Sequence, residues 1–506
     1  MMANHLFDRL TAGAPAPGTP FIQAGPGPGV SYGELKPLSG RIANVLAGIG
    51  VKPGDRVAVQ VEKSVDALLL YLACVRVGAV ILPLNTGYTA AEVDYFVGDA
   101  EPALLVVDPA KAAALAPVAA AHHARLETLG PSGEGSLPRL AAHADPEFRT
   151  VSRGPADLAA ILYTSGTTGR SKGAMLSHDN LASNAEMLVD YWRFTSKDVL
   201  IHALPIFHTH GLFVATNVIL CAGASMFFLP RFDPAEVIAL MAKATCLMGV
   251  PTFYTRLLAQ PGLTREASAS MRLFISGSAP LLAETHRDFE ARTGHAILER
   301  YGMTETNMNT SNPYDGDRVP GTVGFPLPGV SLRVVEPETG APVEAGAIGM
   351  IEVKGPNVFQ GYWRMPEKTK AEFRADGYFI TGDLGRIDAR GYVHIVGRGK
   401  DLVISGGFNV YPKEVEGEID ALPGVVESAV IGVPHPDFGE GVTAVVVRKP
   451  GATLDEAGVL AALAERLAKF KQPKAVLFVD DLPRNTMGKV QKNLLRETYK
   501  GIYAAG

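Results

Sequence analysis

Cysteine is scarce in this sequence of 506 residues. Only Cys74, Cys221 and Cys246 occur, each inside an apolar stretch and none in a CxxC or CxxH pair. This usage excludes a disulfide framework and a zinc site of the usual spacing, and it fits a reducing compartment. The N-terminus has no basic segment followed by an apolar run, so we expect no secretory signal and a cytoplasmic location.

The sequence also has little excess charge. Its formal net charge is −5, with 47% hydrophobic and 20% charged residues, so we expect small ligands and neither nucleic acid nor a membrane as partner. Residues 201–230 contain no Asp, Glu, Lys or Arg. Their His, Asn, Gly and Pro content favours a buried helix followed by a buried strand over a transmembrane helix.

The order of apolar runs predicts an α/β protein. From about residue 30 to 300, β-branched runs such as 56–61, 79–85 and 103–108 alternate with helical patterns. This alternation is typical of mostly parallel sheets with covering helices. After Pro320 the pattern changes to turns and short alternating strands, which predicts a β-rich subdomain.

A chain of this length needs more than one hydrophobic core. Glycines lie on both sides of the charged centre of residues 397–407, which predicts a linker. Residues 408–506 repeat an α+β pattern and are numerous enough for a small lobe. We therefore predict a large N-terminal domain over 1–398 and a small α+β C-terminal domain over 399–506.

YTSGTTGRSKG, residues 163–173, is the first of five segments that suggest chemistry. Placed between a strand and a helix, its Gly, Ser and Thr residues can direct backbone N–H groups and hydroxyls at one anion, and Arg170 and Lys172 add charge. No GxxxxGK[ST] pattern can be read here, so this is not a Walker A loop. On composition alone, a flexible surface turn remains an alternative.

Two further segments follow predicted strands. In ERYGMTE, residues 299–305, Glu305 can ligate a hard cation such as Mg²⁺, and the Tyr301 ring can lie against a base. In LFISGSAPL, residues 273–281, a strand leads into a Gly-Ser turn with Pro280 as the expected first residue of a helix. Such turns lie at the carboxyl edge of a sheet, where ligands bind. Ordinary turns without a ligand remain the alternative.

The last two segments lie toward the C-terminus. YFITGDLG and VGRGKDLV place Asp383 and Arg398 in a glycine-rich β region. The aspartate can accept both ribose hydroxyls, and the arginine can support a ribose or phosphate oxygen. Lys489 lies in the polar loop LPRNTMGKVQKN. Solvated turn residues and a solubilising lysine remain the alternatives.

In this order and spacing, the five segments resemble the adenylate-forming superfamily of acyl-CoA synthetases, luciferases and nonribosomal-peptide adenylation domains, over essentially the whole chain. The resemblance implies ATP, Mg²⁺ and coenzyme A as cofactors, an acyl-AMP intermediate, and a small C-terminal domain that is mobile about a hinge. One departure is Ser171, where the family often has Pro before its lysine. This exchange changes loop stiffness more than chemistry.

The resemblance also implies a role for each matching residue. Lys489 would meet the substrate carboxylate and the α-phosphate during adenylation, Glu305 would bind magnesium, and Lys400 would be the hinge. The residues expected around ATP are Thr164, Ser165, Gly166, Thr167, Thr168, Gly169, Lys172, Ser278, Ala279, Pro280, Arg300, Tyr301, Gly302, Met303, Thr304, Asp383 and Arg398. The coenzyme A channel would be lined by His208, Ser405, Gly406 and Gly407.

The segments expected to line the acid pocket are polar. An arginine facing a small pocket favours a second carboxylate, because arginine binds carboxylates bidentately. Together with residues 299–318, the pattern resembles the malonyl-CoA synthetases, which implies that His210, Arg256 and Ser278 hold the free carboxylate of malonate. A helix-capping role for Arg256 and a core position for His210 remain alternatives.

The resemblance implies an ATP-dependent ligase that forms malonyl-CoA from malonate, ATP and coenzyme A. It does not rank malonate against methylmalonate. The alternatives are a synthetase for another small or aryl acid, a nucleotide-binding regulator without turnover, and an adenylation domain that serves a carrier protein. A lysine acetyltransferase is a further expected partner, because some relatives are switched off when the lysine matching Lys489 loses its charge by acetylation.

Overall fold

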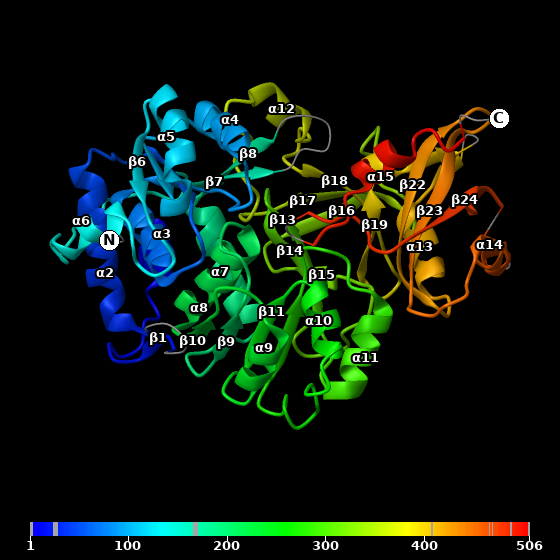
Figure 1. Ribbon diagram of the computed structural model, residues 1–506, viewed down its shortest axis with the longest axis horizontal. Helices are drawn as coiled ribbons and strands as arrows, with labels where there is room; N and C mark the ends of the chain where they lie inside the picture. Colours follow the sequence, from blue (N-terminus) through cyan, green and yellow to red (C-terminus); the bar gives the residue numbers. More distant parts are fainter. Residues whose placement is uncertain are drawn as a thin grey trace. The chain divides into compact units, whose positions relative to one another are not determined.

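The computed structural model describes residues 4–23, 29–164, 171–405, 408–464, 466–467, 469–485 and 488–503. Residue contacts divide the chain into two compact units (Figure 1). Unit 1 comprises Met1–Pro320, Phe325–Ser331 and Lys354–Phe379, and unit 2 comprises Gly321–Gly324, Leu332–Val353 and Ile380–Gly506. The predicted domain boundary between residues 398 and 399 stays a prediction.

The first sheet of unit 1 has the strand order β6-β5-β3-β4-β7-β8. Its strands pair in parallel except β7 with β8, which pair antiparallel. Apolar residues of α4 and α5 pack on β3, β4 and β5 to form a buried core. The bounds are β3 (Arg56–Gln60), β4 (Val80–Pro83), β5 (Leu104–Val107), β6 (Arg125–Thr128), β7 (Leu158–Thr164), β8 (Lys172–Ser177), α2 (Tyr32–Gly48), α3 (Val65–Val77), α4 (Ala90–Ala100), η1 (Pro109–Lys111), α5 (Ala112–Ala121) and α6 (Ser136–Ala142).

The second sheet of unit 1 has the order β15-β14-β13-β12-β11-β9-β10-β1-β2. Its central strands, from β13 to β1 in this order, are parallel. The bounds are β1 (Pro20–Ile22), β2 (Val30–Ser31), β9 (Val199–His202), β10 (Ser225–Phe228), β11 (Cys246–Gly249), β12 (Leu273–Ser276), β13 (Leu298–Met303), β14 (Asn307–Ser311), β15 (Phe325–Pro326), α1 (His5–Leu10), α7 (His178–Tyr191), η2 (His210–Thr216), α8 (Asn217–Ala222), α9 (Pro234–Met241), α10 (Pro251–Leu258), α11 (Ala283–Thr293) and α12 (Pro366–Ala371).

Unit 2 contains a sheet of order β16-β17-β18-β19 and a sheet in which β21-β20-β23-β22 is extended by β24 on β23. Buried residues of α13 and α14 pack on the second sheet, which gives the predicted α+β lobe. The bounds are β16 (Ser331–Val335), β17 (Gly349–Lys354), β18 (Phe379–Ile387), β19 (Val393–Arg398), η3 (Gly399–Asp401), β20 (Val403–Ser405), β21 (Phe408–Val410), α13 (Pro412–Asp420), β22 (Val425–His435), β23 (Gly439–Arg448), α14 (Glu456–Ala464), η4 (Lys469–Lys471), β24 (Ala475–Val479) and α15 (Lys492–Tyr499).

The predicted α/β class is therefore confirmed, with two local corrections. The segment 163–173 joins two antiparallel strands and not a strand and a helix, because β8 turns back along β7 before α7 begins. Pro280 does not start a helix, since α11 begins at Ala283 after the cap residue Leu282.

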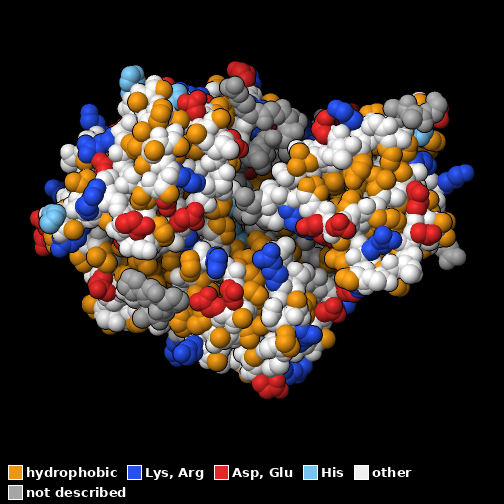
Figure 2. All heavy atoms as spheres, in the orientation of Figure 1, with side chains coloured by type: hydrophobic (Ala, Val, Ile, Leu, Met, Phe, Trp, Pro, Cys, Tyr) orange, Lys and Arg blue, Asp and Glu red, His pale blue; other side chains and the backbone are white. Residues whose placement is uncertain are grey.

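Residues 201–230 form the end of β9, then η2, α8 and β10, as the predicted buried helix and strand require. In the described part of the chain, no helix combines the length and the apolar character needed to cross a bilayer. On the face that Figure 2 shows, Lys and Arg side chains are interspersed with Asp and Glu, which agrees with the small net charge.

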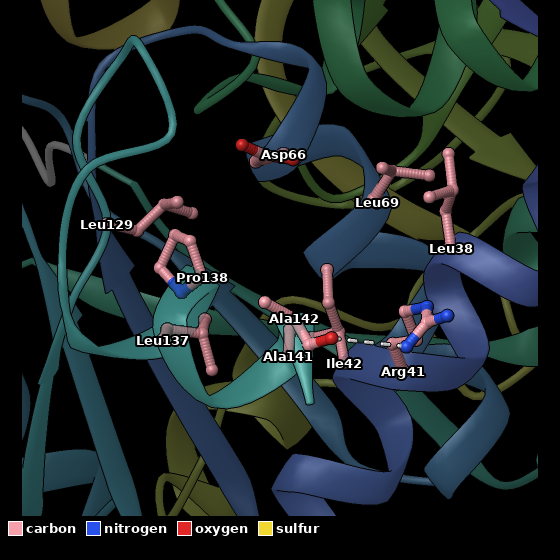
Figure 3. Close-up of a pocket in the computed structure, with 10 residues that line it drawn as sticks. All are labelled: Leu38, Arg41, Ile42, Asp66, Leu69, Leu129, Leu137, Pro138, Ala141 and Ala142. Atoms are coloured by element: carbon pink, nitrogen blue, oxygen red, sulfur yellow. Dashed lines mark hydrogen bonds between the residues drawn. The ribbon is translucent and has the colours of Figure 1, made fainter. Parts of the chain in front are cut away.

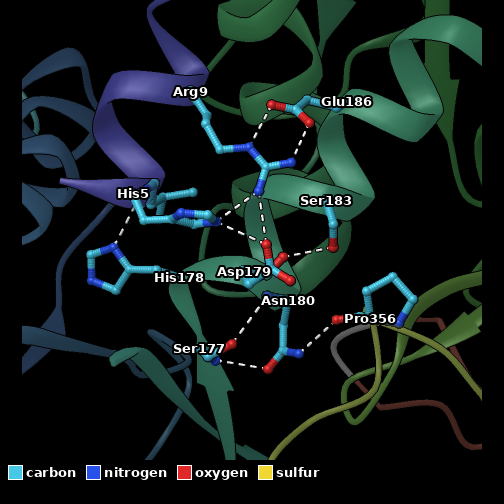
Figure 4. Close-up of polar contacts among 10 residues, drawn as sticks. His5, Arg9, Ser177, His178, Asp179, Asn180, Ser183, Glu186 and Pro356 are labelled. Carbon is cyan, nitrogen blue, oxygen red and sulfur yellow. Dashed lines mark hydrogen bonds and ion pairs between the residues drawn. The ribbon is translucent and has the colours of Figure 1, made fainter. Parts of the chain in front are cut away.

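A polar network joins α1 to α7 (Figure 4). Asp179 Oδ1 lies 2.8 Å from His5 Nε2 and 2.7 Å from Arg9 Nη1, and Arg9 Nε donates to Glu186 Oε1 at 2.7 Å. Because α7 directly follows β8, this network fixes the helix that supports the strand of Lys172.

His178 makes the stability of this network depend on pH. It is buried, its Nδ1 accepts from the Leu6 N–H at 3.3 Å, and burial followed by the charge of Arg153 lowers its pKa to about 4. An unfolded histidine titrates near pH 6.5, so the unfolded chain binds more protons as pH falls from about 6.5 to about 4. Stability should therefore fall in this window, by at most about 3 kcal/mol.

The substitution His178→Asn keeps an acceptor and removes the titration. We expect it to flatten the change in urea midpoint between about pH 7 and pH 5. His123→Asn, at an exposed histidine, is the control and should leave that change as in the wild type. An equal pH dependence in the His178 variant would show that another group causes it.

Candidate active site

The π-helical turn η2 places His210 against the turn that follows β12. His210 is 3% exposed, and its Nδ1 lies 3.3 Å from Ser278 Oγ. Ser278 has a φ of 71°, in the left-handed region that non-glycine residues seldom adopt and that is enriched at functional sites. The structure thus brings together two of the three residues expected around the acid carboxylate.

Arg300 of β13 lies close enough to His210 for its charge to act on that side chain, and its predicted place among the ATP residues stays a prediction. A Cβ on Gly277 would come within 2.3 Å of Arg300 Cζ, so only glycine at that position leaves room for the guanidinium. Arg300 is 4% exposed, and burial lowers its pKa to about 9. Its Nε and Nη2, like His210 Nε2, have no hydrogen-bond partner among the residues that the structure describes. We call His210, Ser278 and Arg300 the donor cluster.

The electrostatics of the donor cluster favour an anion. Burial, and then the charge of Arg300, lower the pKa of His210 well below its usual value, so the imidazole is neutral. Buried donors are normally bonded, and leaving them without an acceptor costs free energy. A carboxylate presents two oxygens that accept several such bonds at once.

Arg256 is the third residue expected around the acid carboxylate. It lies in the last turn of α10, is exposed, and makes no hydrogen bond or ion pair within the described residues. A cation at this helix end is favourable by itself. The sequence pattern identified the residue type but gave no measure of exposure, and the role of Arg256 in acid binding stays a prediction.

Lys172, at the start of β8, belongs to a second polar group. Lys172 Nζ lies 3.1 Å from Glu372 Oε1 and 4.1 Å from the centroid of the Tyr362 ring. The Tyr362 hydroxyl lies 2.6 Å from Glu372 Oε2 and 3.1 Å from Glu305 Oε1. Tyr362 and Glu372 thus connect Lys172 to Glu305, and neither was predicted, because no catalytic pattern in the sequence includes them.

Glu305 fits the magnesium role by its chemistry. It is a carboxylate, 6% exposed, in the turn between β13 and β14. Among the described residues no group of three or more His, Cys, Asp or Glu side chains could hold a metal ion. Mg²⁺ is commonly bound by one or two carboxylates and the phosphates of its substrate, so one carboxylate suits an ion that arrives with a nucleotide.

The other predicted residues of unit 1 that the structure describes lie in β7, in the β13–β14 hairpin and in the turns before η2 and α11. Gly302 allows the hairpin to close, since a Cβ there would lie 1.9 Å from the Asn307 carbonyl oxygen. His208 is partly buried, with its ring 4.7 Å from that of Phe207. Tyr301, Met303 and Thr304 belong to the hairpin, Ala279 and Pro280 to the turn before α11, and Thr164 Oγ1 lies 3.5 Å from the Lys172 carbonyl oxygen. Ser165, Gly166, Thr167, Thr168 and Gly169 lie outside the described residues.

In unit 2 the structure brings the two predicted ribose residues together. Asp383 of β18 and Arg398 of β19 are opposite each other, and Arg398 Nε lies 3.0 Å from Asp383 Oδ1. Lys400 follows in η3, next to Asp401, which pairs with Arg496 of α15. Ser405 is buried at the end of β20, whereas Gly406 and Gly407 lie outside the described residues.

Lys489 is exposed on a loop with a well-bonded backbone. Its N–H donates to Asn485 Oδ1 at 2.9 Å, and its carbonyl accepts from the Asn485 N–H at 2.9 Å. Arg484, which pairs with Glu427 of β22, donates to the Gly488 carbonyl at 2.7 Å. Backbone hydrogen bonds therefore hold the main chain at Lys489, while the residue itself is exposed.

A cavity of about 170 Å³ lies apart from these residues, between α2, α3 and α6 (Figure 3). Its lining is mainly apolar, with Asp66 and Arg41 at its edge, and includes none of the predicted site residues. Arg41 already donates to the Ala144 carbonyl at 2.5 Å. The cavity therefore gives no support for a catalytic role.

Comparison with known proteins identifies the family of this chain. The AMP-binding enzyme model matches residues 11–363, and the model of the AMP-binding enzyme C-terminal domain matches residues 414–489. A malonate–CoA ligase of Arabidopsis thaliana is 34% identical over 93% of this chain and 85% of its own length, and a feruloyl-CoA synthase of Amycolatopsis is 37% identical over 94% of each. The crystal structure of ATP-bound MatB from Rhodopseudomonas palustris is 70% identical and covers 99% of this chain and 100% of its own, with a TM-score of 0.97. The chain belongs to the AMP-binding enzyme family.

Proposed function

We propose that this chain is an ATP-dependent malonate–CoA ligase. It joins malonate to coenzyme A through malonyl-AMP, and releases pyrophosphate in the first step and AMP in the second. Family membership, the malonate–CoA ligases among its relatives and the 70% identity to MatB support this proposal. The observation that carries the choice of acid is the donor cluster, in which the buried His210 and Arg300 keep N–H donors that have no partner among the described residues and that suit a carboxylate.

The donor cluster recognises the carboxylate that does not react. If the Ser278 hydroxyl donates to His210 Nδ1, the imidazole proton lies on Nε2 and is directed at the acid. Arg300 Nε and Nη2 lie on one edge of the guanidinium and bind a carboxylate bidentately. An acid without a second carboxylate leaves Arg300 buried and unpaired, which penalises its binding.

Adenylation requires that two anions meet. A carboxylate oxygen of malonate bonds to the α-phosphorus of ATP, and the bond to the pyrophosphate oxygen breaks. Mg²⁺, when bound with ATP, neutralises charge on the phosphates. Glu305 would hold that ion, Lys172 would bind phosphate oxygens, and Lys489 would bring its ammonium to the carboxylate and the α-phosphate. Thr304, Asp383 and Arg398 would position the α-phosphate and ribose.

Thioester formation needs a different arrangement of the same site. The thiol of coenzyme A attacks the acyl carbon, the thiol proton is lost and AMP leaves with the electrons of the broken bond. We propose that the C-terminal domain, residues 399–506, turns about Lys400 between the two steps, so that Lys489 leaves and Ser405 approaches the coenzyme A arm beside His208. This is the gating that lids provide in other enzymes.

A synthetase for an aryl acid is the second candidate, because the feruloyl-CoA synthase is 37% identical over 94% of this chain. AMP release that depends on coenzyme A, measured with acetate, malonate, methylmalonate, succinate and coumarate, separates the candidates. We expect the highest rate of AMP release with malonate. The rate with methylmalonate should be lower by no more than about 10–200-fold, and the rate with acetate by up to about 10⁴. Equal rates with acetate, or a faster rate with coumarate, would refute the malonate proposal, and no release with any acid would favour a regulator.

Two further proposals concern the setting of the enzyme. We propose that the enzyme is cytoplasmic, because its few cysteines, none of them in a CxxC pair, fit a reducing compartment. We also propose that Lys489, exposed on its loop, is a target of a lysine acetyltransferase, because acetylation would remove the charge that adenylation needs. Full activity of protein acetylated at Lys489 would contradict the second proposal.

A further inference from the structure

A buried lysine–histidine pair contacts Gly211, the residue that follows His210 of the donor cluster. Lys63 follows β3, and His202 is the last residue of β9; they are 8% and 0% exposed. Lys63 Nζ lies 3.0 Å from His202 Nδ1 and donates to the His202 carbonyl at 2.7 Å. His202 Nε2 lies 2.9 Å from the carbonyl oxygen of Gly211. Neither side chain belongs to the phosphate, magnesium or coenzyme A residues.

The contacts fix the direction of each hydrogen bond. The Lys63 nitrogen is the donor, so His202 Nδ1 must accept, and the imidazole proton therefore lies on Nε2 and is donated to Gly211. Burial lowers the pKa of both side chains, which keeps the imidazole neutral as this arrangement requires. The Phe228 ring covers the pair, 4.3 Å from Lys63 Nζ and 5.1 Å from the His202 ring.

The Gly211 carbonyl oxygen, near the start of η2, contacts two side-chain groups. Gly211 directly follows His210, and a Cβ on it would lie 2.0 Å from the Pro205 carbonyl oxygen, so the two backbones touch. The same Gly211 oxygen accepts from Thr216 Oγ1 at 3.1 Å. A π-helical turn is rare and is less favourable than an α-helical one, and here one side-chain donor from outside the turn, His202 Nε2, bonds to its second residue.

We propose that Lys63 and His202 are positioning residues for acid selection, which fix the Gly211 carbonyl and thereby hold His210 against Ser278 in the donor cluster. This inference rests on the proposed function, since it takes His210 as a ligand of the second carboxylate. Without the pair, η2 is free to relax toward α-helical geometry, and His210 moves away from Ser278. The affinity for malonate then decreases, whereas the affinities for ATP and coenzyme A do not change.

The test compares two substitutions of His202. His202→Leu removes both ring nitrogens, whereas His202→Gln can place an amide N–H where Nε2 donates. We expect His202→Leu to raise the KM for malonate about tenfold and to lower the malonate-to-acetate ratio of kcat/KM by a similar factor, as for one lost buried hydrogen bond. The KM values for ATP and coenzyme A should not change, and His202→Gln should recover most of the loss.

Lys63→Met tests the same inference from the other end of the pair. It keeps the length of the side chain and removes the donor, so the malonate KM should rise by a factor of a few. If His202→Leu does not fold, the malonate KM of Lys63→Met still tests the inference. The control is Tyr32→Phe, which removes a buried hydroxyl that donates to the Ala224 carbonyl at 2.7 Å in the same unit, and which should leave the malonate-to-acetate ratio unchanged.

The outcomes separate this inference from the function on which it rests. A wild type that does not prefer malonate to acetate overturns the proposed function, and this inference with it. A wild type that does prefer malonate, together with folded Lys63 and His202 variants of unchanged malonate KM, overturns the inference alone. Equal rises in the KM for malonate and for ATP, without recovery in His202→Gln, would also overturn it, because they indicate a general structural role.

Discussion

Replacing Lys489 by alanine is expected to lower the rate of adenylation by about 10²–10³, or about 3–4 kcal/mol in the barrier. The ammonium neutralises charge that develops on the α-phosphate while the malonate carboxylate approaches, and alanine offers no substitute. ATP–pyrophosphate exchange that depends on malonate measures this step. Thioester formation from supplied malonyl-AMP should be largely retained, because the second step needs no lysine at the α-phosphate.

The control is Lys500→Ala, at an exposed lysine of the same C-terminal segment that pairs with Glu497. It removes one positive charge from the segment and should leave both half-reactions as in the wild type. If Lys489→Ala keeps ATP-dependent turnover, Lys489 has no part in the mechanism. If both half-reactions fall equally, the substitution has damaged the lobe and not one step.

Arg300→Met should lower kcat/KM for malonate by about 10²–10³, because removing one partner of a buried charge pair costs about 3–4 kcal/mol. Activity with acetate should hold or rise, because methionine removes the buried cation that acetate leaves unpaired. The preference for the diacid should therefore collapse. Thermal stability is a second readout. Methionine replaces a buried cation that has no ion-pair partner in the described part of the chain, so the melting temperature should hold or rise.

Arg256→Met is the matched comparison for Arg300. The structure predicts a small effect, since Arg256 is exposed at the end of α10, whereas the sequence pattern predicts the diacid-specific loss at this position. A loss confined to malonate in Arg256→Met, with Arg300→Met unaffected, would show that the donor cluster is wrongly assigned. A loss in both variants would mean that both arginines reach the acid.

The strands were predictable because their signal is local. Runs such as 56–61 and 103–108 are apolar and β-branched along their own length, and each contains a parallel strand, β3 and β5. The course of the chain after residue 164 was not predictable in this way. It depends on β8 pairing back on β7, and the start of α11 depends on the packing of the turn before it.

The site was predictable where its residues lie in motifs and not where they act through distant contacts. Asp383 and Arg398 carry recognisable neighbours in the sequence, and the structure pairs them. Tyr362 reaches Glu305 from 57 positions away, and Lys63 reaches His202 from 139. Such pairings depend on strand order, which no short pattern contains.

The left-handed backbone at Ser278 restricts how this enzyme can change its substrate. Every residue with a Cβ is strained there, and β-branched residues most of all, so threonine or valine would weaken the turn while altering the acid site. Glycine alone relaxes the turn, and it deletes the hydroxyl that faces His210. A laboratory selection for activity on simpler acids should therefore enrich glycine at position 278. The main-chain conformation thus limits which acid specificities can arise by substitution at this position.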